Sequence, residues 1–118
     1  MAELVTCLST GKGTWSLVNR LLENESWEKI ILITNEFGKE NFKKNDKSEF
    51  LVVNPDQDIK ELRDEIHDRL KDKIKNTEVS VNFISGSGKE HMALIGALLK
   101  LGVGIRLAAL TKEGLEEI

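Results

Sequence analysis

The chain has almost no cysteine and no long apolar segment, and both absences exclude whole classes of protein. Its single cysteine, Cys7, cannot form an internal disulfide, which is typical of proteins that work in a reducing compartment. No apolar run approaches the roughly 20 residues of a membrane-spanning helix. The N-terminus lacks the basic region and the cleavage site of a secretory signal peptide and leads directly into a predicted strand. We therefore expect a cytoplasmic protein with no membrane partner.

The chain also has no excess of basic residues. The 17 Lys and Arg are outnumbered by 20 Asp and Glu, which gives a formal net charge of −3. Extended binding to DNA or RNA usually needs a basic surface, so none is expected, whereas a small anion in a locally basic pocket remains compatible. His, Cys and acidic residues nowhere show the spacing of metal ligands, so we expect neither a metal nor another cofactor.

What the sequence does contain is an alternation of strand-like and helix-like segments. The apolar patterns predict strands at 3–8, 27–34, 49–53, 78–84 and 103–110, and helices at 15–25, 59–74 and 89–101. Asn54-Pro55-Asp56 ends the third strand and offers the N-cap of the next helix. Segment 35–47 is either a loop or a short helix, and 115–118 is expected to be a short antiparallel edge strand.

Strands that alternate with helices favour βαβ units and a parallel sheet. With a right-handed crossover at each step, the predicted strand order is 3-2-1-4-5, with the antiparallel strand at the edge. The expected fold is therefore a single α/β domain over residues 1–118, a Rossmann-like three-layer sandwich. The helix at 89–101 is apolar around much of its circumference, which indicates a second covering surface such as a subunit partner.

Two turns rich in Gly, Ser, Thr and Lys follow the first and the fourth strand. They comprise Ser9, Thr10, Gly11, Lys12, Gly13 and Thr14, and Ser85, Gly86, Ser87, Gly88 and Lys89. In the predicted order these strands are neighbours, and the switch point of the sheet lies between their carboxyl ends. A helix N-terminus at this place favours anions, phosphate above all. We therefore predict one crevice, flanked by both turns, for a phosphate-containing ligand.

The first turn also has other interpretations. It lacks the spacing of a P-loop, and it matches a dinucleotide-binding fingerprint only in Gly11 and Gly13, with Glu36 as the ribose-binding acid. A purely structural turn, with Thr14 as a helix cap, is equally compatible with the residues.

In the second turn, Lys89 is either an anion-binding ammonium or a solvated side chain. Its place in a first helical turn runs against the helix dipole, which favours the ligand role. His91 is either a ligand contact or acid/base group, or only a capping or surface group. Cys7 is better explained as a core residue than as a nucleophile.

The stretch from Asn82 to Leu94 resembles the ligand-binding turn of CARF domains, the CRISPR-associated Rossmann-fold sensors. Its central run Ser85-Gly86-Ser87-Gly88-Lys89 carries most of the likeness, and Ser9 to Thr14 resembles the other ligand-contacting motif of that family. The likeness extends over the whole chain, which looks like a stand-alone or excised sensor domain. The expectations in the next paragraph rest on this resemblance.

The resemblance implies a homodimer that binds cyclic oligoadenylate, the second messenger of type III CRISPR antiviral immunity. Both turns, Asn35 and His91 would contact the ring. The protein would act either as a sensor or as a metal-independent ring nuclease, in which Lys89 stabilises the charge as a ribose 2′-OH attacks the adjacent phosphate. Two alternatives stay open: a Rossmann-like protein that binds NAD(P) or a mononucleotide, and a non-catalytic interaction module that docks through the helix at 89–101.

Overall fold

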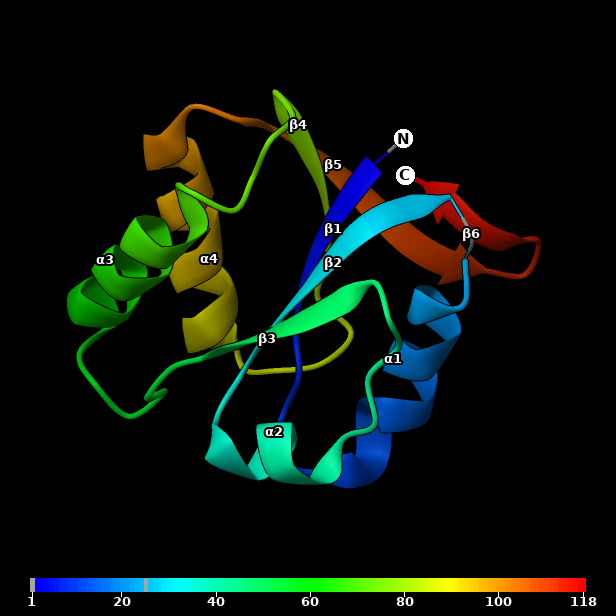
Figure 1. Ribbon diagram of the computed structural model, residues 1–118, viewed down its shortest axis with the longest axis horizontal. Helices are drawn as coiled ribbons and strands as arrows, with labels where there is room; N and C mark the ends of the chain where they lie inside the picture. The colour runs from blue at the N-terminus through cyan, green and yellow to red at the C-terminus, as the bar shows by residue number, and fades with distance from the viewer. Residues whose placement is uncertain (1, 25) are drawn as a thin grey trace.

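Strands and helices alternate along the chain, as the computed structural model shows for residues 2–24 and 26–118 (Figure 1). The strands are β1 (Ala2–Cys7), β2 (Trp27–Thr34), β3 (Ser48–Val52), β4 (Glu78–Asn82), β5 (Gly104–Thr111) and β6 (Gly114–Glu117). The α-helices are α1 (Trp15–Leu22), α2 (Glu36–Asn41), α3 (Ile59–Leu70) and α4 (Gly88–Leu101), and a 3₁₀ turn, η1 (Lys12–Thr14), precedes α1.

The strands form one six-stranded sheet with the order β3-β2-β1-β4-β5-β6. All neighbouring strands are parallel except β5 and β6, which pair antiparallel with Leu110 opposite Leu115. This confirms the predicted Rossmann-like α/β fold, including its antiparallel edge strand. Strands β1 and β4 lie side by side in the middle of the sheet, with Thr6 opposite Asn82. The turns that follow them therefore leave the sheet at the same edge.

Each face of the sheet has its own apolar core, because successive side chains of a buried strand point to opposite faces. On β1, Val5 packs into the core beneath α3 and α4, whereas Leu4 packs into the core beneath α1. Figure 1 shows α3 and α4 together on one side of the sheet and α1 on the other. At the carboxyl edge, α2 lies beside the start of α1, where the rings of Phe37 and Trp15 are 6.1 Å apart.

Helix α3 follows the predicted apolar stripe. Leu62, Ile66 and Leu70 are fully buried, and Glu65 and Arg69 form an ion pair at 3.3 Å on the same helix. The helix ends at Leu70, however, so Ile74 packs against the core from the loop that follows. Segment 35–47 was expected to be either a loop or a short helix. Residues 36–41 form a short helix, α2.

The structure corrects several predicted boundaries, and local hydrogen bonds explain them. Helix α3 is capped by Asp58, which accepts a hydrogen bond from the Lys60 N–H, whereas Asn54 forms a turn of its own with the Asp56 N–H. Strand β4 ends at Asn82 and not at Ile84, because the Ile84 N–H donates to the Asn82 side chain and does not pair with a neighbouring strand.

Helix α1 was predicted to reach residue 25, but it ends earlier. Its last residue is Leu22, and a turn stabilised by the Asn24 side chain and the Ser26 N–H (2.8 Å) follows. Residue 25 itself lies outside the described residues.

Candidate functional site at the carboxyl edge of the sheet

One buried hydroxyl joins the two predicted turns. The Ser85 oxygen accepts a hydrogen bond from the Ser9 N–H and another from the Thr14 hydroxyl, each 2.7 Å long. Ser9 and Thr14 approach each other as well, with their side-chain oxygens 3.3 Å apart. Because Ser9 and Ser85 are 76 residues apart in sequence, this contact exists only through the pairing of β1 with β4. The sheet thus brings the two turns together, as the strand order predicted.

Ser85 itself is nearly inaccessible, with only 1% of its surface exposed. Its hydroxyl already serves two donors, and its carbonyl oxygen accepts a hydrogen bond from His91 Nε2 (2.8 Å). The His91 ring also packs on Phe83, with ring centroids 4.7 Å apart. Ser85 and His91 therefore hold the second turn in place against the sheet and the first turn of α4.

Gly86 is the residue that allows this turn to lie so close to β1. Its φ angle of +100° is one that residues with a side chain rarely adopt. An added Cβ would also come within 2.9 Å of the Cys7 Cβ and 3.1 Å of His91 Nε2. Glycine is thus required here by both backbone and packing.

A capping box closes the N-terminus of α4. The Ser87 hydroxyl accepts a hydrogen bond from the Glu90 N–H (3.2 Å), and the Glu90 carboxylate accepts one from the Ser87 N–H (2.8 Å). Gly88 is the first residue of the helix, and Lys89 follows it with an exposed side chain. The carboxylate of Glu90 offsets part of the positive charge of the helix terminus, while the ammonium of Lys89 adds positive charge beside it.

The first turn presents a more open surface. Thr10, Gly11, Lys12 and Gly13 are exposed, and a Cβ added at either glycine would meet no atom within 4 Å. These glycines therefore leave room above the turn without being needed for packing. The Lys12 ammonium lies 5.8 Å from the Trp15 ring and 6.0 Å from the Phe37 ring, so a cation is held over an aromatic surface here.

Asn35 and Cys7 have structural roles, whereas Glu36 is exposed. Asn35 caps α2, because its side-chain oxygen accepts a hydrogen bond from the Gly38 N–H (3.0 Å). Cys7 is fully buried, and burial, with a smaller contribution from the Glu90 carboxylate, raises the pKa of its thiol well above the usual range. This agrees with its interpretation as a core residue. Glu36, the proposed ribose-binding acid of the dinucleotide alternative, is exposed in the first turn of α2.

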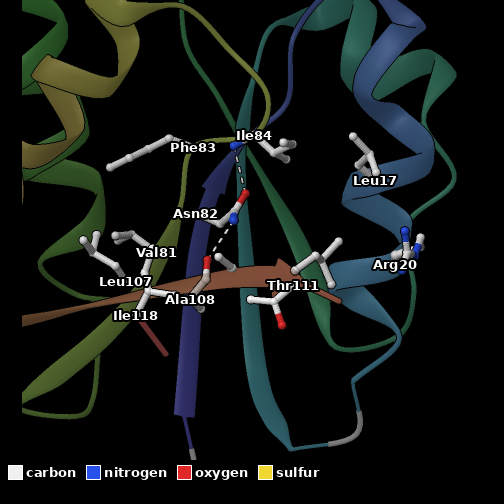
Figure 2. Close-up of a pocket in the computed structure, with 12 residues that line it drawn as sticks. Leu17, Arg20, Val81, Asn82, Phe83, Ile84, Leu107, Ala108, Thr111 and Ile118 are labelled. Carbon is white, nitrogen blue, oxygen red and sulfur yellow. Dashed lines mark hydrogen bonds between the residues drawn. The ribbon is translucent and has the colours of Figure 1, made fainter. Parts of the chain in front are cut away.

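The sequence pattern gave no indication of a neighbouring apolar pocket, which has a volume of about 420 Å³ and lies between α1 and the strands β4 and β5 (Figure 2). None of the predicted site residues lines it. Leu17 and Arg20 contribute from α1, and Ile84 contributes from the segment between β4 and the second turn. Helix α1 and Ile84 are far apart in the sequence, so only the packing of α1 against the sheet brings them together.

The described residues contain no group of three or more His, Cys, Asp or Glu side chains placed to hold a metal ion. Across residues 2–24 and 26–118, no helix has both the length and the apolar character needed to cross a membrane. Comparison with known proteins gives no relative: no protein-family model matches the chain, and no curated protein matches it significantly.

Proposed function

We propose that this chain is a CARF-like sensor domain that binds cyclic oligoadenylate at the carboxyl edge of its sheet. The observation that carries the proposal is the junction of the two turns, in which the Ser85 hydroxyl joins Ser9 and Thr14 at 2.7 Å. The junction lies between β1 and β4, where the strand order reverses. This is the place where open α/β sheets bind their ligands.

The exposed groups around the junction suit a phosphate-containing ligand. Lys12 on the first turn and Lys89 on the second each present an ammonium, and Gly11 and Gly13 leave the backbone open to a close approach. Lys12 lies over the Phe37 ring, so a cation and an aromatic surface are available together beside the turn. Phosphates and bases of a nucleotide ligand need both kinds of contact.

The proposed assembly is a homodimer. A ring with two-fold symmetry fits a two-fold interface, in which each copy supplies the same turns. Helix α4 offers a surface for this contact, because Met92, Ile95 and Leu99 follow one another at helical spacing along it. Met92 is 68% exposed and Leu99 is 66% exposed, which is unusual for large apolar side chains on one helix face.

Cleavage of the ring is the catalytic form of the same proposal. A ribose 2′-oxygen attacks the adjacent phosphorus, the bond from phosphorus to the 5′-oxygen breaks, and the proton of the 2′-OH ends on the departing 5′-oxygen. The product is one linear chain that carries a 2′,3′-cyclic phosphate at one end and a 5′-OH at the other. Lys89 is the group assigned to stabilise the negative charge that develops on the phosphate oxygens. No metal ion is needed for this reaction.

The test is binding of labelled cyclic tetra-adenylate and cyclic hexa-adenylate in the presence of EDTA, with the Lys89→Ala variant beside the parent protein. We expect micromolar or tighter binding of one ring and a loss of at least about tenfold in Lys89→Ala, since a charge-assisted phosphate contact is removed. Lys100→Ala, at the other end of α4 and also exposed, is the matched control and should bind like the parent.

Several outcomes would contradict the proposal. Absence of binding to both rings would reject it, and binding of NAD, NADP or ATP in their place would favour the dinucleotide or mononucleotide alternative. If a ring is bound and cut at the same rate by Lys89→Ala, that lysine has no part in the chemistry. A monomer at all concentrations, with and without the ring, would exclude the shared site.

A further inference from the structure

The apolar pocket beside α1 is separate from the two turns and is not used by the proposed function. Its walls are formed mainly by apolar side chains, among them Leu17 of α1, Ala108 and Leu110 of β5, and Ile84. Ile84 is 44% exposed although it is a large apolar residue. In Figure 2, Leu17 and Arg20 come from α1, while Ile84, Ala108 and Thr111 come from the opposite side of the pocket. Its volume of about 420 Å³ falls within the range of small-ligand sites, roughly 300–1,000 Å³.

Two polar side chains in the pocket are already paired with the backbone. Asn82 donates from its amide nitrogen to the Ala108 carbonyl (2.7 Å) and accepts from the Ile84 N–H (2.8 Å), as Figure 2 shows. Thr111 donates to the Gly114 carbonyl and accepts from the Glu113 N–H. These bonds hold both side chains against the backbone.

Arg20 is the exception among the polar side chains of the pocket. It is exposed in the last turn of α1, and within the described residues its guanidinium has no hydrogen bond or ion pair. The nearest acid in sequence, Glu23, lines a different hollow together with Lys43. The other arginine on this face, Arg106, is bound to Glu78 and Glu117. An apolar pocket with one unpaired guanidinium is complementary to a ligand that has an apolar body and one negative group.

We propose that this pocket binds a small amphipathic organic anion. Its apolar part lies against Leu17, Ile84 and Leu110, and its carboxylate or comparable acidic group pairs with the guanidinium of Arg20. A chain-like acid and an aromatic acid share this chemistry, and the assay separates them. The inference does not rest on cyclic oligoadenylate binding, because Leu17, Arg20 and Leu110 lie outside both turns and Ile84 precedes the second.

The assay is titration of the labelled protein, followed by backbone and methyl NMR shifts, with decanoate below its micelle concentration, 1-naphthoate, decan-1-ol and acetate. We expect decanoate or 1-naphthoate to shift Leu17, Ile84 and Leu110. Decan-1-ol should bind about tenfold more weakly because it lacks the charge, and acetate should not bind at the same concentrations because it lacks the apolar part. Whichever acid binds more tightly identifies the chain-like or the aromatic class.

Arg20→Gln is the decisive variant, since an exposed side chain can be replaced without loss of folding. It should bind the acid about as weakly as the alcohol, while Lys100→Gln, which removes a remote exposed cation, should bind like the parent. Ala108→Leu, which adds bulk to the pocket, should weaken the acid and the alcohol alike. The proposal is overturned if neither acid shifts the pocket residues, or if Arg20→Gln binds the acid as tightly as the parent protein does.

Discussion

At the scale of single residues, the polar atoms of the two turns divide into those used internally and those left exposed. Ser85, Ser87 and His91 make hydrogen bonds that hold the second turn and the start of α4. Lys12 and Lys89 keep exposed ammonium groups. The residues that hold the turns are thus different from those available to a ligand, although both kinds lie within the same short stretches of sequence.

Gly86 gives the sharpest test at this scale. Gly86→Ala should lower the free energy of unfolding by about 1–3 kcal/mol, because alanine rarely adopts the φ angle of +100° and its Cβ would press on Cys7. Urea denaturation measures this change. Gly88→Ala is the control two residues away, where a Cβ meets no atom within 4 Å, and it should leave stability equal or slightly higher. Equal stability of the two variants would show that the turn has no need of glycine.

At the scale of elements, α4 has distinct surfaces with different roles. Its N-terminus meets the junction of the turns through the capping box of Ser87 and Glu90. One side buries Leu94 and Leu98 against the sheet, and the opposite side exposes Met92 and Leu99. The helix therefore extends from the candidate ligand site along an exposed apolar surface.

The capping box predicts a measurable contribution of Ser87 to stability. Ser87→Ala should reduce the free energy of unfolding by about 1 kcal/mol, because the Glu90 N–H loses its partner at the helix end. Ser87→Thr should retain most of the stability that the cap contributes. Ser16→Ala, at an exposed position of α1, serves as the neutral control. Chemical denaturation followed by circular dichroism gives all three values. A Ser87→Ala variant as stable as Ser16→Ala would mean that the cap does not stabilise α4.

At the scale of the whole molecule, the two faces of the sheet are covered unequally. Helices α3 and α4 lie together over one face, whereas the other carries α1 with α2 beside its start (Figure 1). The apolar pocket extends from α1 to the strands β4 and β5, and Val81, which belongs to the core beneath α3 and α4, lines it as well. It is therefore formed by several packed elements and by no single one.

The reactivity of the single cysteine measures how stably the sheet is folded. Cys7 is fully buried in the central strand β1, and burial raises the pKa of its thiol, which disfavours the reactive thiolate in the folded protein. We expect a thiol reagent to label it at least about a hundredfold more slowly than free cysteine, and only after broad unfolding of the sheet. The rate, followed by mass spectrometry, should rise with urea and reach that of free cysteine in guanidinium. Rapid labelling without denaturant would contradict the central position of β1.

The sequence by itself determined the order of the elements, the parallel sheet and the place where the two turns meet. These follow from local patterns, such as the buried run of β1 and the stripe of Leu62, Ile66 and Leu70, which act over a few residues at a time. The tertiary structure alone decided which polar groups are used for internal bonds. The bond from the Ser9 N–H to Ser85 joins residues 76 positions apart, and the pocket between Leu17 and Ile84 joins elements without a shared motif. Such contacts depend on the register and packing of whole elements, and no local pattern encodes them.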